Sequence, residues 1–174
     1  MTNATKELKK RNEVPVELTW RLEDIFASDE DWKKEYKQLE ADLPQIDKFQ
    51  GKLDTSADAL YDLLKLQDDL SSRLGKLYTY AHMRYDQDTT NSFYQDLNAQ
   101  AETLLTKASS KMSYIVPEIL AMEEGKLDQF LEDEEELKLY EKVLTDIAKR
   151  RPHVLSEKER VSQNSHLDHL WKYV

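Results

Sequence analysis

The scarcity of chain breakers constrains this fold more than any other feature. Only three glycines and four prolines occur in 174 residues, too few to supply the turns of an all-β protein. Apolar residues instead recur every three or four positions, which is the period of an α-helix. We therefore predict an all-α fold, an antiparallel bundle of long helices joined by short links, with no sheet.

Capping residues and breakers locate the first predicted helices. Ser28, followed by three acidic residues, should cap a helix that Pro44 ends or kinks. A second helix should begin near Ser56, continue through Tyr85 and stop at the DQDTTN turn. Its leucines cover more than one face, so part of this apolar stripe should stay exposed and favour self-association as salt rises. These leucines are Leu60, Leu63, Leu64, Leu66 and Leu70.

In the second half of the chain, the sequence predicts one more long helix followed by shorter helical segments. That helix should begin at Phe93 and bend at Pro117. KLDQFL (126–131) predicts a short helical turn, and residues 135–151 predict a helix with acidic residues first and basic residues last. Ser156 should cap one further helix.

Composition excludes several classes of partner. Acidic residues outnumber basic ones by 35 to 25, a net charge of −10, so nucleic acid and anionic membranes are not expected partners. The absence of cysteine excludes disulfides, thiolate nucleophiles and cysteine-ligated zinc. No apolar run is long enough to span a membrane. We expect a cytoplasmic protein.

The histidines near the end of the chain are the first candidate metal ligands. His166 and His169 flank Asp168, but they are three residues apart, and Leu167 follows the first. The zincin motif needs histidines four apart with a glutamate after the first. Two imidazoles without an evident third ligand would hold zinc weakly, so we predict no metal site here.

The DQDTTN turn is a candidate calcium loop. Asp86 and Asp88 have EF-hand spacing, but the sixth and twelfth positions hold Asn91 and Leu97 where glycine and glutamate are required. The turn-and-cap interpretation is therefore preferred.

Three other polar features have structural interpretations. The acidic run Glu132–Glu136 is typical of a solvated first helical turn, and the KRRPH run (149–153) of a helix C-terminus. His82, among the tyrosines of the second helix, should be a partly buried packing residue. The residues themselves thus predict no catalytic, cofactor-binding or metal-ligating group.

Three segments, in order, carry a family resemblance. RNEVPVELTWRLEDIFASDEDWKKEY (11–36) contains a Trp, a Leu–x–Asp–Ile run and an S-D-E-x-W helix start. LGKLYTYAHMRYDQDTTNSFYQDL (74–97) has a D-T-x-N turn, and a further helical region spans residues 113–159. Together they resemble the amino-terminal region of oligoendopeptidase F, a family of bacterial zinc metallopeptidases that cut oligopeptides.

The resemblance implies a helical lobe that forms one wall of an enclosed peptide-binding cavity. In the family a longer catalytic lobe follows, in which HExxH and a later glutamate bind the zinc that activates a water molecule. This chain contains no HExxH. It is therefore expected to be inactive alone and to bind no cofactor itself, its partners being the catalytic lobe and the oligopeptide substrate.

We expect a polar arm over residues 1–19, the helical lobe over 20–159 and an atypical, poorly ordered tail over 160–174. RVSQNSHLDHLWKYV (160–174) departs from the family pattern, as the end of a truncated or frameshifted reading frame or a gene fragment would. The alternative is a free-standing acidic helical module that docks another protein through its apolar stripe.

Overall fold

The computed structural model describes residues 13–153, which form helices and turns without a β-strand. The α-helices are α1 (Asp29–Asp42), α2 (Ala57–Gln87), α3 (Ser92–Met112), α4 (Ile115–Ala121), α5 (Lys126–Asp133) and α6 (Glu141–Ala148). The 3-10 helices are η2 (Val16–Leu18), η3 (Leu22–Asp24), η4 (Leu43–Phe49), η5 (Glu135–Tyr140) and η6 (Arg151–His153). The all-α prediction is confirmed. None of the helices in this range is long and apolar enough to cross a membrane.

The described residues divide into two compact units. The long-helix unit comprises residues 13–48 and 65–113, and the short-helix unit comprises residues 49–64 and 114–153. Helix α2 contributes residues to both. The predicted division into arm, lobe and tail at residues 19 and 159 stays a prediction.

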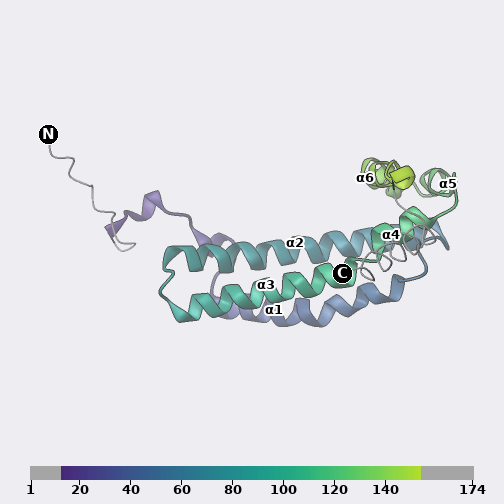
Figure 1. Ribbon diagram of the computed structural model, residues 1–174. Coiled ribbons are helices and arrows are strands. Elements are labelled where there is room, and N and C mark those ends of the chain that lie inside the picture. The colour runs from purple at the N-terminus through teal and green to yellow at the C-terminus, as the bar shows by residue number, and fades with distance from the viewer. Residues whose placement is uncertain (1–12, 154–174) are drawn as a thin grey trace, which may run out of the picture. The chain divides into compact units, whose positions relative to one another are not determined.

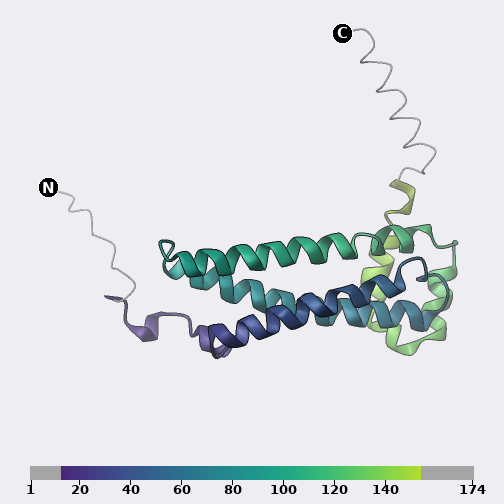
Figure 2. The ribbon, with the colours of Figure 1, turned by 90° about the horizontal axis from the view of Figure 1, so that it is seen from below.

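In the long-helix unit, α1, the later part of α2, and α3 lie side by side (Figures 1 and 2). Trp32 on α1 donates its indole N–H to the Leu77 carbonyl oxygen at 2.8 Å. Ten residues further along α1, Asp42 accepts from Arg73 at 2.9 Å. The partner numbers on α2 fall as those on α1 rise, so the two helices are antiparallel, as predicted.

Side-chain caps explain where two of these helices begin. Ser28 Oγ accepts a hydrogen bond from the Asp31 backbone N–H at 3.1 Å, which confirms the predicted cap of α1. Asn91 caps α3 in the same way, because its side-chain oxygen accepts from the backbone N–H of Phe93 at 3.0 Å. Helix α1 ends at Asp42, and Pro44 follows in η4.

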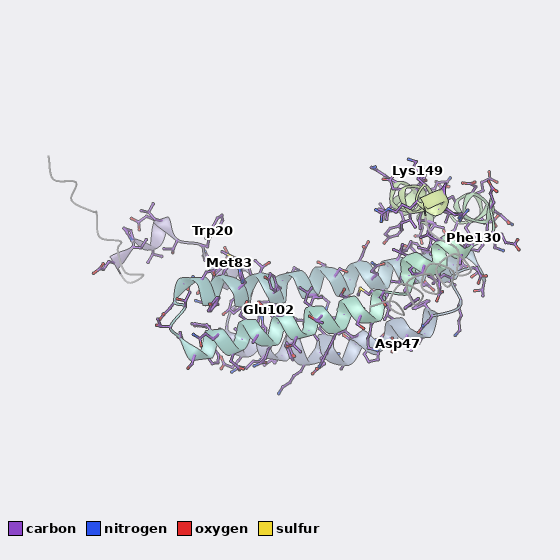
Figure 3. The ribbon with its side chains drawn as sticks, viewed as in Figure 1. Trp20, Asp47, Met83, Glu102, Phe130 and Lys149 are labelled. Carbon is purple, nitrogen blue, oxygen red and sulfur yellow. The ribbon has the colours of Figure 1, made fainter. Side chains whose placement is uncertain are left out.

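The short-helix unit has a mainly aliphatic core. Helix α4 packs on α6, and Figure 1 views α5 and α6 nearly along their axes while α4 lies across the page. Gly125, with φ at +81°, starts α5 in a left-handed conformation that suits glycine. The buried side chains include Leu53, Leu60, Leu63, Ile115, Ile119, Leu127, Phe130, Leu137 and Leu144, of which Phe130 is labelled in Figure 3.

Three details of the predicted helices are wrong. The helix from Phe93 does not continue with a bend at Pro117, because α3 ends at Met112 and a new helix starts at Ile115. Pro117 lies in the first turn of α4, where the N–H that proline lacks would have no helical partner. The predicted helix over residues 135–151 is α-helical only from Glu141, since η5 precedes it.

The third error concerns the apolar stripe of α2. Of the five leucines predicted to form it, Leu60, Leu63, Leu64 and Leu70 are buried and Leu66 is half-buried. The stripe is therefore packed within the structure and does not remain exposed to solvent. The exposed large apolar side chains lie elsewhere: Val16, Leu18, Trp20, Phe93, Leu105, Val116, Leu139 and Val143.

Candidate functional site

The DQDTTN turn is held by its own hydrogen bonds. Asp88 Oδ1 accepts from the Thr90 backbone N–H at 3.0 Å and from the Thr90 hydroxyl at 2.6 Å. Asn91 caps α3, and Leu97 is buried in the core. The turn-and-cap interpretation is confirmed.

His82 is a packing residue on α2, as predicted. Its ring stacks on Tyr78 with centroids 5.3 Å apart and planes 12° apart. Its Nδ1 lies 3.2 Å from Asn98 Oδ1, and its Nε2 lies 3.6 Å from Asp86. These contacts fix the ring between α2 and α3.

For the acidic run Glu132–Glu136, the predicted first helical turn is confirmed at Glu135 and Glu136, which begin η5, and is wrong at Glu132 and Asp133, which end α5. Helix α5 ends at Asp133, and Glu134 caps η5 by accepting from the Glu136 backbone N–H at 3.0 Å. The basic run follows α6, where Lys149 pairs with Asp146 at 3.1 Å.

The candidate zinc ligands His166 and His169, with Asp168 between them, lie outside the described residues, as does Ser156. Within residues 13–153 no group of three or more His, Asp or Glu side chains could hold a metal ion. The absence of a metal site from the whole chain stays a prediction.

A cluster that sequence analysis missed lies near the end of α2. Tyr80 is fully buried and donates its hydroxyl hydrogen to Asp29 Oδ1 at 2.9 Å. Four residues later, Arg84 donates from Nη2 to Glu23 Oε1 at 3.0 Å, and its guanidinium lies 5.1 Å from the Tyr80 ring centroid. The spacing places Tyr80 and Arg84 on one helix face, but their partners lie 51 and 61 residues away. No local pattern reveals them.

The electrostatics of this cluster point to positioning rather than proton transfer. Burial raises the pKa of Tyr80 to about 12. A general acid or base works best with a pKa near the operating pH, so Tyr80 stays a neutral hydrogen-bond donor. It joins α1 to α2, and Arg84 joins η3 to α2.

A pocket of about 520 Å³ lies beside the cluster, within the long-helix unit. We call it the arm pocket; its lining residues include Val14, Val16, Trp20, Glu23, Arg84 and Gln87. The Nε of Arg84 is buried and has no hydrogen-bond partner among the described residues. Figure 3 shows the Trp20 side chain projecting outward from the ribbon. The volume falls within the range of ligand pockets, and the apolar side chains in its lining suit an apolar group.

Comparison with known proteins places this fold in a family. Residues 118–160 match the family model described as oligopeptidase F. Over 153 residues the chain is 58% identical to oligopeptidase PepF of Bacillus subtilis, an alignment that covers 88% of this chain and 23% of that protein. The chain belongs to the oligoendopeptidase F family. It corresponds to the amino-terminal region of such peptidases, so the resemblance seen in the sequence is confirmed.

Solved structures agree with this assignment. Oligoendopeptidase F from Enterococcus faecium is 33% identical, with a TM-score of 0.66 over 77% of this chain and 27% of that one. A chain from Chlamydophila abortus gives a TM-score of 0.78 over 94% of this chain and 28% of its own, at 23% identity, which shows the fold alone. The chain spans about a quarter of the length of these oligoendopeptidase F relatives.

Proposed function

We propose that these residues serve as the amino-terminal helical part of an oligoendopeptidase F-type peptidase that hydrolyses oligopeptides. The 58% identity with oligopeptidase PepF carries this proposal. The composition would suit a free-standing acidic interaction module equally well. The sequence identity to the peptidase therefore favours the peptidase role over the module. In the proposed role the helices form part of a wall around the peptide and restrict access by folded chains.

Catalysis in this proposal falls to the rest of the parent polypeptide, because this chain contains no HExxH. A catalytic zinc needs three protein ligands and an open position, and residues 13–153 contain no group that could supply them. The family zinc therefore does not fit this part of the chain. The helices contribute a rigid scaffold, because the hydrogen bonds of Trp32 and Arg73 hold α1 against α2.

A chimera tests the proposal. The matching region of the Bacillus subtilis peptidase is replaced by the aligned residues of this chain, and cleavage of a quenched fluorescent oligopeptide is measured. We expect kcat/KM within about tenfold of the parent enzyme. A matched chimera carries an unrelated helical bundle of equal length. Equal activity in both chimeras, or none in a folded chimera with this chain, would contradict the proposal.

A further inference from the structure

The segment before α1 exposes three large apolar side chains within five residues. Val16, Leu18 and Trp20 are 82%, 74% and 78% exposed, whereas the next apolar residue, Leu22, is 1% exposed. A single exposed apolar residue needs no explanation. A cluster that includes a tryptophan is typical of a surface that another protein segment covers.

The arm pocket adds an independent observation at the same place. Val16 and Trp20 line it together with Arg84. Glu23, another lining residue, accepts from Arg84 Nη2 at 3.0 Å, so the guanidinium beside the pocket is held in place. The pocket is therefore a preformed hollow next to the exposed apolar side chains.

The relatives indicate what the occupant is. This chain matches 23% of the Bacillus subtilis peptidase and 27% of the Enterococcus faecium chain. In those proteins, therefore, the equivalent segment shares its polypeptide with roughly three times as many further residues. A second copy of this chain is a poorer occupant, because a net charge of −10 on each molecule opposes association.

We propose that Val16, Leu18, Trp20 and the arm pocket form a docking surface for the remainder of an oligoendopeptidase F polypeptide. The remainder places an apolar side chain against Trp20. This inference rests on the proposed function and names the surface through which the helical part joins the rest of the enzyme.

The test compares Trp20→Ser in two settings, the 174-residue chain and the active chimera. In the chain alone the melting temperature should not change, because the side chain is already exposed. In the chimera the rate of activity loss at a fixed elevated temperature should rise about tenfold, as expected for removal of a tryptophan anchor. Trp20→Phe, which keeps most of the apolar surface, should restore most of the wild-type rate.

A matched control is Lys34→Ser on α1, whose side chain is also 78% exposed. It should change neither measurement, because an exposed ion pair contributes little. A control that accelerates inactivation as much as Trp20→Ser would overturn the docking surface.

Each alternative gives a distinct result. A lower melting temperature for Trp20→Ser in the 174-residue chain would show that the chain covers Trp20 itself and would overturn the proposal. Light scattering that shows self-association of the wild-type chain, abolished by Trp20→Ser, would assign the surface to a second copy. If the chimera is active and Trp20→Ser does not change its rate of thermal inactivation, the docking surface is wrong but the proposed function stands. If the chimera is folded but inactive, the proposed function is wrong as well.

Discussion

The two units differ in what holds their segments in register. In the long-helix unit, side chains link helices that are distant in sequence, as Trp32 does to Leu77 and Arg73 does to Glu35 and Asp42. The short-helix unit also has long-range links, from the Gly51 N–H to Glu118 Oε1 and from Arg151 Nε to the Leu120 carbonyl oxygen, but its chain direction changes at closely spaced turns such as Gly125 and η5. Long helices can slide along one another and depend on specific anchors for their register, whereas the short helices are positioned by turns as well as by such links.

The largest effect should come from removing the central anchor of the long-helix unit. Trp32→Ala deletes a fully buried indole and its hydrogen bond to the Leu77 carbonyl, so the free energy of unfolding should fall by about 3–5 kcal/mol. Urea unfolding followed by far-UV circular dichroism measures this loss. Trp32→Phe keeps most of the packing and should lose less. Equal losses for the two variants would show that the hydrogen bond, which both lack, carries the effect and that the ring packing matters little.

The corresponding change in the short-helix unit should cost less. Leu144→Ala removes a buried aliphatic side chain of α6 without breaking a polar anchor, and about 2–4 kcal/mol should be lost. The same urea titration applies. If Leu144→Ala destabilises the chain more than Trp32→Ala does, the contrast between anchored and turn-defined units is wrong.

Arg73→Met should have an intermediate effect that depends on pH. Arg73 binds Glu35 at 2.6 Å, Asp42 at 2.9 Å and the exposed Asp69 at 3.3 Å, and the side chains of Arg73, Glu35 and Asp42 are partly buried. Its loss leaves three carboxylates without their cation and should cost about 1–3 kcal/mol at neutral pH. The exposed Lys76→Met, on the same helix, is the control.

The pH dependence follows from the Asp42 carboxylate. The hydrogen bond from Arg73 lowers the pKa of Asp42 below its ordinary value of 3.8. A lowered folded-state pKa contributes stability above the unfolded-state pKa, and that stability is lost as pH falls through the folded-state value. Wild-type stability should therefore decline more steeply below pH 3.8 than that of Arg73→Met. Parallel acid titrations of melting temperature would contradict this.

The smallest effects should come from two glycines, with opposite signs. Gly75 lies inside α2 with open space around its α-carbon, so Gly75→Ala should stabilise by about 0.5–1 kcal/mol. Gly125 has φ at +81°, where a β-carbon is strained, so Gly125→Ala should destabilise by about 1 kcal/mol. Thermal melts of the two variants give the signs directly, and a shift in the same direction for both would contradict the backbone argument.

Local signals in the sequence predict the start and end of most helices. Ser28 and the acidic turn after it determine the start of α1, and the polar DQDTTN cluster ends α2. The break before Ile115 escaped prediction because Pro117 can bend a helix or start one, and only tertiary packing decides. The 3-10 helix at Glu135–Tyr140 has the apolar spacing of an α-helix, so the sequence pattern does not distinguish the two.

The candidate docking surface was predicted less well. Trp20 and Leu22 both belong to the motif that suggested the family, yet one is exposed and the other is fully buried. Periodicity separates faces only within a regular helix, and Trp20 precedes η3 in an irregular segment. The Arg84 cluster depends on contacts across more than 50 residues, so it requires a structure.

The contrast between Trp20 and Trp32 also gives the chain two optical reporters once the third tryptophan, Trp171, is replaced by phenylalanine. The Trp32 indole is fully buried and hydrogen-bonded to a helix carbonyl, whereas the Trp20 indole is mostly in water. Iodide should therefore quench Trp20 emission selectively in the native chain and reach Trp32 only after unfolding. Emission from Trp32 should shift to longer wavelength when the helices separate, whereas emission from Trp20 should shift to shorter wavelength when another surface covers it. One spectrum can thus distinguish loss of structure from gain of a partner.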